Sequence, residues 1–264
     1  LLGHYADTDG WNKVISDVKT VNEHIHQEHP ELPLVILGHS MGSFVVRCYV
    51  KRHPKTVTAM MLSGSGSHTI ADVLKARAGI ALEMWRLGPK GRSPLLDQLT
   101  FATYNKVFAP NRTTADWLSR DPREVDKYVD DPLCGYLCTN QFWSDLIDGI
   151  EEIRLPSSVR SIPKTMPVLI FSGERDPLSY NDKDHGITRL ARMYENAGMQ
   201  NVAVKLFPNG RHEILNETNR HDVIDFLIEW LELQNLLIAA PTPAAPAAAA
   251  TTTKKKSGKK TAAH

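Results

Sequence analysis

The chain of 264 residues has few cysteines, no surplus of either charge and no long hydrophobic run. Its three cysteines, Cys48, Cys134 and Cys138, are too few for a disulfide framework and lack the spacing of zinc ligands. We therefore expect reduced thiols and a cytoplasmic location. A net charge of +1 argues against a dedicated nucleic-acid-binding protein, which would show a basic surplus. No apolar stretch reaches the roughly 18 residues that a membrane-spanning helix needs.

The two ends of the chain differ from its body. The chain begins with Leu1 rather than methionine and shows no signal-peptide pattern, so we expect a fragment or an incomplete gene model. Residues 239–264 contain ten alanines, three prolines, five lysines and no acid, which predicts a disordered tail. Its lysines could form a nuclear address or a tether to an anionic surface, but a solubilising tail is the simpler interpretation.

Short apolar runs alternate with amphipathic segments along the body of the chain. The apolar runs predict buried strands at residues 34–37, 57–62, 168–171 and 202–207. Helical spacing predicts helices at residues 11–27, 41–52, 187–197 and 220–236, with Asp9 as the N-cap of the first. This alternation indicates the α/β class, with a mostly parallel sheet covered by helices on both faces. We assign residues 1–67 and 163–238 to this core.

A long insertion, residues 68–162, separates the second and third predicted strands. It is too long for a loop, and its apolar residues show helical spacing, as in Trp143, Leu146, Ile147 and Ile150. We predict a helical cap over the C-terminal edge of the sheet. Five aromatic residues could line an apolar pocket beneath it, or simply form the core of the cap: Trp85, Phe101, Tyr104, Phe108 and Trp117.

Residues 38–42 read Gly-His-Ser-Met-Gly and lie directly between a predicted strand and a predicted helix. G-x-S-x-G in this setting predicts a sharp turn that lifts the hydroxyl of Ser40 above the sheet edge. We expect Gly38 and Gly42 to be glycines because a side chain would clash with the turn. The helix N-terminus and the amide of Met41 would stabilise an oxyanion.

A nucleophilic serine needs a histidine base and an acid that orients the base. Asp176 follows the third predicted strand and His212 follows the fourth, so both lie in loops at the sheet edge that carries Ser40. The order Ser40, Asp176, His212 is that of an α/β-hydrolase triad. Asp182 and Asp184 are competing acids farther along the chain.

These residues resemble the α/β-hydrolases of the monoacylglycerol lipase and lysophospholipase group, which are often grouped with prolyl-aminopeptidase-like serine peptidases. The resemblance runs from about residue 5 to residue 236. It is carried by residues 6–11, 37–42, 108–112, 131–135, 172–177 and 210–217. It implies Ser40 as nucleophile, Asp176 as acid, His212 as base, and a cap that admits one acyl chain.

The resemblance also implies elements that this sequence does not contain. Members of the group carry about four strands before the first helix found here, and a His-Gly loop that supplies the second oxyanion donor. We expect both to be missing, which would leave the Met41 amide alone in the oxyanion hole and the strand at 34–37 as an exposed sheet edge.

The sequence thus predicts a serine hydrolase of lipid-like carboxylic esters, monoacylglycerols or lysophospholipids, that needs no cofactor and no metal. Transient contact with a membrane surface is a further expectation. One alternative is a peptidase that holds a substrate ammonium with one of five acids of the cap: Glu83, Asp97, Asp116, Asp145 or Asp148. Two others remain: a catalytically impaired lipid-binding protein and an interaction module that acts through its tail.

Overall fold

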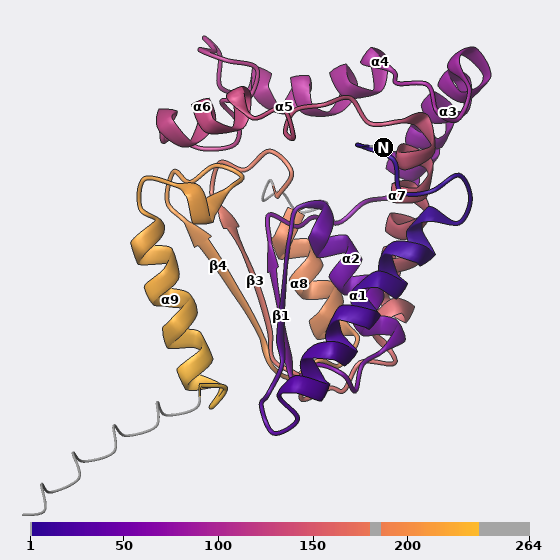
Figure 1. The fold of residues 1–264 in the computed structure, drawn as a ribbon. Coiled ribbons are helices and arrows are strands. Elements are labelled where there is room, and N and C mark those ends of the chain that lie inside the picture. The colour runs from indigo at the N-terminus through magenta and orange to yellow at the C-terminus, as the bar shows by residue number, and fades with distance from the viewer. Residues whose placement is uncertain (1, 180–185, 238–264) are drawn as a thin grey trace, which may run out of the picture.

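A computed structural model describes residues 2–179 and 186–237 and contains a parallel sheet of four strands within them (Figure 1). The strands β1 (Val35–His39), β2 (Ala59–Ser63), β3 (Val168–Gly173) and β4 (Val202–Phe207) are neighbours in chain order. All three pairings are parallel. The apolar runs predicted all four strands, and their ends differ from the prediction by at most two residues.

Helices cover both faces of the sheet, as the alternating pattern predicts. On one face lie α1 (Gly10–Glu28), α2 (Met41–Arg52) and α8 (Gly186–Asn196), packed on Met60, Leu62 and Ile170. On the other lies α9 (Arg220–Leu233), packed on Met61 and Leu169. Alternate residues of one strand thus serve opposite faces. Figure 1 shows α9 alone on its side of the strands.

Two details of the helix boundaries differ from the prediction. Asp9 precedes α1 but lies in the left-handed region at φ 58°, and its side chain forms no capping hydrogen bond. Instead, Asn12 Nδ2 donates to Asp9 Oδ1 at 2.5 Å. At the other end, α9 ends at Leu233, three residues before the predicted end.

The segment between β2 and β3 is helical, with α3 (Ile70–Leu87), α4 (Pro94–Asp97), α5 (Thr103–Lys106), α6 (Pro122–Asp130) and α7 (Asn140–Ile153). A π-helical turn, Gln98–Ala102, joins α4 to α5. Short 3-10 turns follow α7 (Pro156–Val159) and β4 (Ile214–Asn216). In Figure 1, helices α4 to α6 form a row above the sheet, and α3 stands beside α7 at one end of this row, while α7 also packs beside α1 and α2. The whole helical segment between β2 and β3 is called the cap below.

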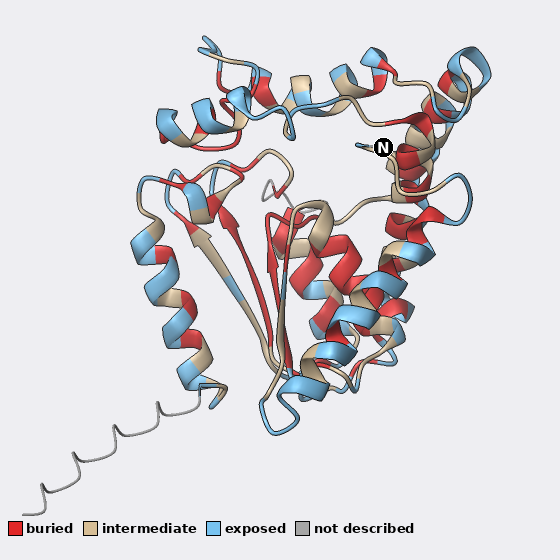
Figure 2. Cartoon of the chain, in the orientation of Figure 1, coloured by how far each residue is buried: buried red, intermediate tan, exposed pale blue. Residues whose placement is uncertain are grey.

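Burial is greatest in β2 and β3 and lower in β1 and β4, the two edge strands of the described sheet (Figure 2). Leu37 of β1 is 41% exposed. Within residues 2–179 and 186–237, no helix combines the length and apolarity needed to cross a bilayer. The predicted disordered tail lies outside the described residues.

Candidate active site

Ser40 occupies the sharp turn between β1 and α2. Its backbone has φ 53° and ψ −122°, a conformation that L-residues rarely adopt. The turn is held from both sides, since Ser40 N donates to the Ser63 carbonyl at 2.9 Å and Ser43 N donates to the Ser40 carbonyl at 2.9 Å. The strained turn places the Ser40 side chain in the wall of a cavity beneath the cap.

The two glycines of the motif have different roles. A Cβ on Gly38 would lie 2.4 Å from the carbonyl oxygen of Gly42, so β1 and α2 approach too closely for any side chain there. A Cβ on Gly42 would meet no atom within 4 Å. The expected steric reason for glycine is therefore confirmed at position 38 and wrong at position 42.

The structure brings the three predicted residues together. Ser40 Oγ lies 2.8 Å from His212 Nε2, and Asp176 Oδ1 lies 2.9 Å from His212 Nδ1. Asp176 is fully buried and His212 is 2% exposed. The arrangement gives a hydroxyl, a base in hydrogen-bond contact with it, and a carboxylate that fixes the opposite nitrogen of the base.

Asp176 remains ionised despite its burial. Burial alone would raise its pKa, but the charge and hydrogen bond of His212, with hydrogen bonds from Ser172 and Ser179, together lower the pKa to about 2. Ser172 Oγ donates to Asp176 Oδ2 at 2.7 Å, and the Leu178 amide donates to Oδ1 at 3.0 Å. The acid is therefore a carboxylate with several donors at neutral pH.

The loops of the acid and the base pack tightly on each other. A Cβ on Gly173, at the end of β3, would lie 2.2 Å from the carbonyl oxygens of Gly210 and Arg211. The Arg175 amide donates to the Gly210 carbonyl at 2.9 Å. Because Gly173 has no side chain, the two loops can approach closely enough for Asp176 to contact His212.

A set of buried serines that the sequence analysis did not identify joins the nucleophile turn to the acid loop. Ser43 Oγ lies 2.6 Å from the Ser40 carbonyl oxygen and 2.8 Å from Ser65 Oγ. Ser179 Oγ donates to the Ser65 carbonyl at 2.7 Å. The Ser-Gly repeat at residues 63–67 is the only sequence signal, and it resembles an ordinary turn.

His39 lies beside the base. Its ring centroid is 4.7 Å from that of His212, and its Nδ1 lies 3.0 Å from Ser63 Oγ. Burial, followed by repulsion from His212, lowers the pKa of His39 to about 4. His39 is therefore neutral near pH 7 and adds no second positive charge beside His212.

Met41, the predicted oxyanion donor, is the first residue of α2. Amides in the first turn of a helix have no intrahelical acceptor, and the helix dipole adds positive potential there. The side chain of Met41 lines the same cavity as Ser40, and the Tyr5 hydroxyl lies 2.6 Å from Met41 Sδ.

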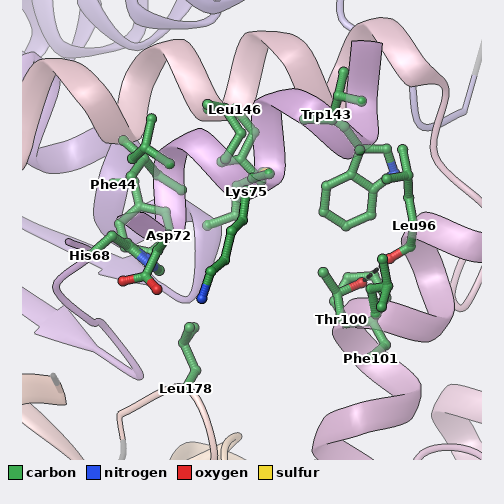
Figure 3. A pocket seen from close by; sticks show the side chains of 18 of the residues that line it. Phe44, His68, Asp72, Lys75, Leu96, Thr100, Phe101, Trp143, Leu146 and Leu178 are labelled. Atoms are coloured by element: carbon green, nitrogen blue, oxygen red, sulfur yellow. Dashed lines mark hydrogen bonds between the residues drawn. The ribbon is translucent and has the colours of Figure 1, made fainter. Parts of the chain in front are cut away.

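The cavity beneath the cap has a volume of about 520 Å³ and a mostly apolar lining. In Figure 3, Leu96, Phe101 and Trp143 lie at one end and Phe44 and His68 at the other. Lys75 extends toward Leu178 between the two ends. The volume and lining of the cavity suit a flexible hydrocarbon chain.

Not every predicted pocket residue lines this cavity. Phe101, Tyr104 and Trp117 do. Trp85 is 83% exposed, and Phe108 lies under the guanidinium of Arg211. Phe108 packs with Trp117 and Leu118 in the core of the cap, which is the second of the two expected roles. Trp85 has neither role, because it faces outward on α3.

The acids considered for binding an ammonium lie elsewhere. None of Glu83, Asp97, Asp116, Asp145 and Asp148 lines the cavity, whereas Asp72 does. Asp72 Oδ2 accepts hydrogen bonds from the amide and hydroxyl of Thr69, the N-cap residue of α3. Asp182 and Asp184, the competing triad acids, lie outside the described residues. The described part of the chain contains no cluster of three His, Cys, Asp or Glu side chains suited to a metal.

Comparison with known proteins identifies the family of this chain. The family model described as "Serine aminopeptidase, S33" matches residues 2–219. The chain belongs to this family. Similar proteins include the monoacylglycerol lipase of Mycolicibacterium smegmatis, 27% identical over 83% of this chain and 69% of the relative. The human monoglyceride lipase is 25% identical over the same shares.

Solved structures of similar fold include esterases and lipases. A thermostable carboxyl esterase from Bacillus coagulans has a TM-score of 0.76 at 20% identity, over 87% of this chain and 73% of that one. A lipase in its open form has a TM-score of 0.70 at 24% identity, over 83% and 71%. This protein of the serine aminopeptidase family therefore has the α/β-hydrolase fold.

Proposed function

We propose that this protein hydrolyses carboxylic esters of lipids that carry one acyl chain, monoacylglycerols or lysophospholipids, with Ser40 as nucleophile. The observation that carries the proposal is the hydrogen-bonded series Ser40–His212–Asp176, which opens on an apolar cavity of about 520 Å³. The names of the relatives, monoacylglycerol lipase and monoglyceride lipase, support the substrate class.

In the first half of the reaction, Ser40 Oγ attacks the ester carbonyl carbon and its proton passes to His212 Nε2. The carbonyl oxygen becomes an oxyanion facing the Met41 amide, and Asp176 stabilises the imidazolium. The tetrahedral intermediate collapses when the C–O bond to the alcohol breaks, and the leaving alkoxide takes the proton from His212. The acyl group remains on Ser40.

In the second half, His212 removes a proton from water, and the resulting hydroxide attacks the acyl-enzyme carbonyl. The Ser40–acyl bond breaks, His212 returns its proton to Ser40 Oγ, and a fatty acid leaves. The neutral His39 beside the base leaves Asp176 as the charged partner of the imidazolium. Every step uses side chains, the Met41 amide and water, so no cofactor or metal enters the proposal.

Ester hydrolysis is favoured over peptide hydrolysis. An aminopeptidase binds a substrate ammonium, which requires a carboxylate directed at it. Among the described residues, Asp72 is the only acid that lines the cavity. Its carboxylate already accepts two hydrogen bonds from Thr69. Release of oleate from monooleoylglycerol, compared with release of nitroaniline from alanine nitroanilide, separates the two activities. We expect the first and not the second, with Ser40→Ala inactive; the reverse result would contradict the proposal.

We also propose transient contact with a lipid surface through one face of α3. Leu74, Leu82 and Trp85 lie on this face and are 60%, 48% and 83% exposed. The other face of α3 lines the cavity with Val73 and Ile80. A helix with a solvent-facing apolar stripe and an exposed tryptophan suits the boundary between lipid headgroups and acyl chains.

The cytoplasm remains our proposed location. Its support is chemical, because the three cysteines are free thiols.

A further inference from the structure

Trp117 of the cap stacks on the imidazole of His212. The ring centroids lie 4.7 Å apart with 30° between the ring planes, and Trp117 is only 6% exposed. Trp117 also lines the cavity that contains Ser40. A side chain of the cap, more than ninety residues away in sequence, therefore contacts the base directly.

Backbone hydrogen bonds fix this contact. The His212 amide donates to the Trp117 carbonyl at 3.3 Å, and the Glu213 amide donates to the Leu118 carbonyl at 2.7 Å. The Trp117 amide in turn donates to Asn105 Oδ1 at 3.0 Å, which ties it to α5. The backbone of Trp117 is therefore attached both to the histidine loop and to the cap.

Side chains strengthen the same attachment. Ser119 Oγ donates to the Asn216 carbonyl at 2.9 Å. Arg120 Nε lies 2.8 Å from Glu217 Oε2, and Glu217, which is fully buried, also accepts from the Arg211 amide at 2.9 Å. Residues 117–120 of the cap and 211–217 of the histidine loop therefore form one packed unit.

The chemistry of His212 indicates a role for its contact with Trp117. His212 becomes an imidazolium while the oxyanion forms, and the electron-rich face of an indole attracts a cation more strongly than other side-chain rings do. The burial of both rings removes competing water. Stacking also restricts rotation of the imidazole, whose Nε2 must stay aligned with Ser40 Oγ.

Resting on the proposed function, we infer that Trp117 is a positioning residue for the catalytic base, through which the cap holds His212 in line with Ser40. Removal of the indole ring is expected to lower kcat even for a substrate too short to fill the cavity. Replacement by another aromatic ring is expected to preserve most of the rate.

The experiment compares Trp117→Leu and Trp117→Phe with wild type on nitrophenyl acetate. We expect Trp117→Leu to reduce kcat about 10- to 100-fold with KM changed less than about threefold, and Trp117→Phe to stay within about threefold of wild type. Trp117→Met, which retains apolar bulk without a ring, is expected to match Trp117→Leu and replaces it if that variant does not fold. Val107→Ala, an exposed position of the cap outside the cavity, is the control and should leave both constants unchanged.

Unchanged kcat in folded Trp117→Leu or Trp117→Met would overturn the inference, as would a loss confined to KM or a Phe variant as slow as the Leu variant. Ester hydrolysis that persists in Ser40→Ala would instead overturn the proposed function and the inference with it. The two failures are therefore distinguishable.

Discussion

Asp176 Oδ1 lies 2.9 Å from His212 Nδ1, and both side chains are shielded from solvent. The carboxylate therefore selects the tautomer in which Nδ1 carries the proton and Nε2 faces Ser40 Oγ. This relationship determines whether Ser40 can lose its proton.

Asp176→Asn tests that relationship. An amide can donate to Nδ1 and thereby favour the wrong tautomer, and it cannot stabilise an imidazolium. We expect kcat for a soluble ester to fall by about 10⁴, with a nearly unchanged KM. Steady-state kinetics measure this, and a kcat within tenfold of wild type would exclude Asp176 as the orienting acid.

The stability of the protein should depend on the same carboxylate in acid. The folded-state pKa of Asp176, about 2, lies below the ordinary value of 3.8, so its ionised form contributes to the free energy of unfolding. That contribution, about 2 kcal/mol, is complete above about pH 4 and is lost as the pH falls through about 2. Denaturant unfolding of wild type and Asp176→Asn between these limits should show a steeper decline for wild type. Parallel curves would contradict the assignment of the low pKa.

The volume of the cavity should set the acyl chain length. Gly79 on α3 lines the cavity, and the nearest atom to an added Cβ would be Leu96 Cδ2 at 3.8 Å. Gly79→Leu therefore places a side chain in the space proposed for the acyl chain. We expect kcat/KM for a palmitoyl ester to fall about tenfold relative to a butyryl ester, a difference of about 1.4 kcal/mol. An unchanged ratio would show that the acyl chain lies elsewhere.

Contact with lipid should depend on the exposed face of α3. Trp85→Ser removes its largest apolar side chain and is expected to weaken binding to phosphatidylcholine vesicles about tenfold, or ~1.4 kcal/mol. Leu233→Ser, at a position 71% exposed at the end of α9, is the control and should bind as wild type does. Equal vesicle binding by Trp85→Ser in a sedimentation assay would argue against this surface.

The sequence was sufficient to predict that Ser40, Asp176 and His212 lie together, because their placement depends on local signals. Each of them lies in the loop after an apolar strand, and parallel strands bring their carboxyl ends to one edge. The serines at 43, 65 and 179 and the stacking of Trp117 on His212 could not be predicted in this way. They depend on how the cap and the loops pack across long separations in sequence, for which no local pattern exists.

Trp85 illustrates a signal that was present in the sequence but was not used. It shares a helix face with Leu74 and Leu82, whereas Val73 and Ile80 occupy the face toward the cavity. Helical spacing therefore predicts an outer position for Trp85, whereas its residue type alone left open whether it lines the pocket or belongs to the core of the cap. Position on the helix proved more informative than residue type.

The central claim is that Ser40 is an activated nucleophile, and a fluorophosphonate tests it most directly. We expect intact-mass analysis of the treated 264-residue chain to show one covalent adduct, and none on Ser40→Ala. A wild-type chain without an adduct, or an equal adduct on Ser40→Ala, would contradict the account.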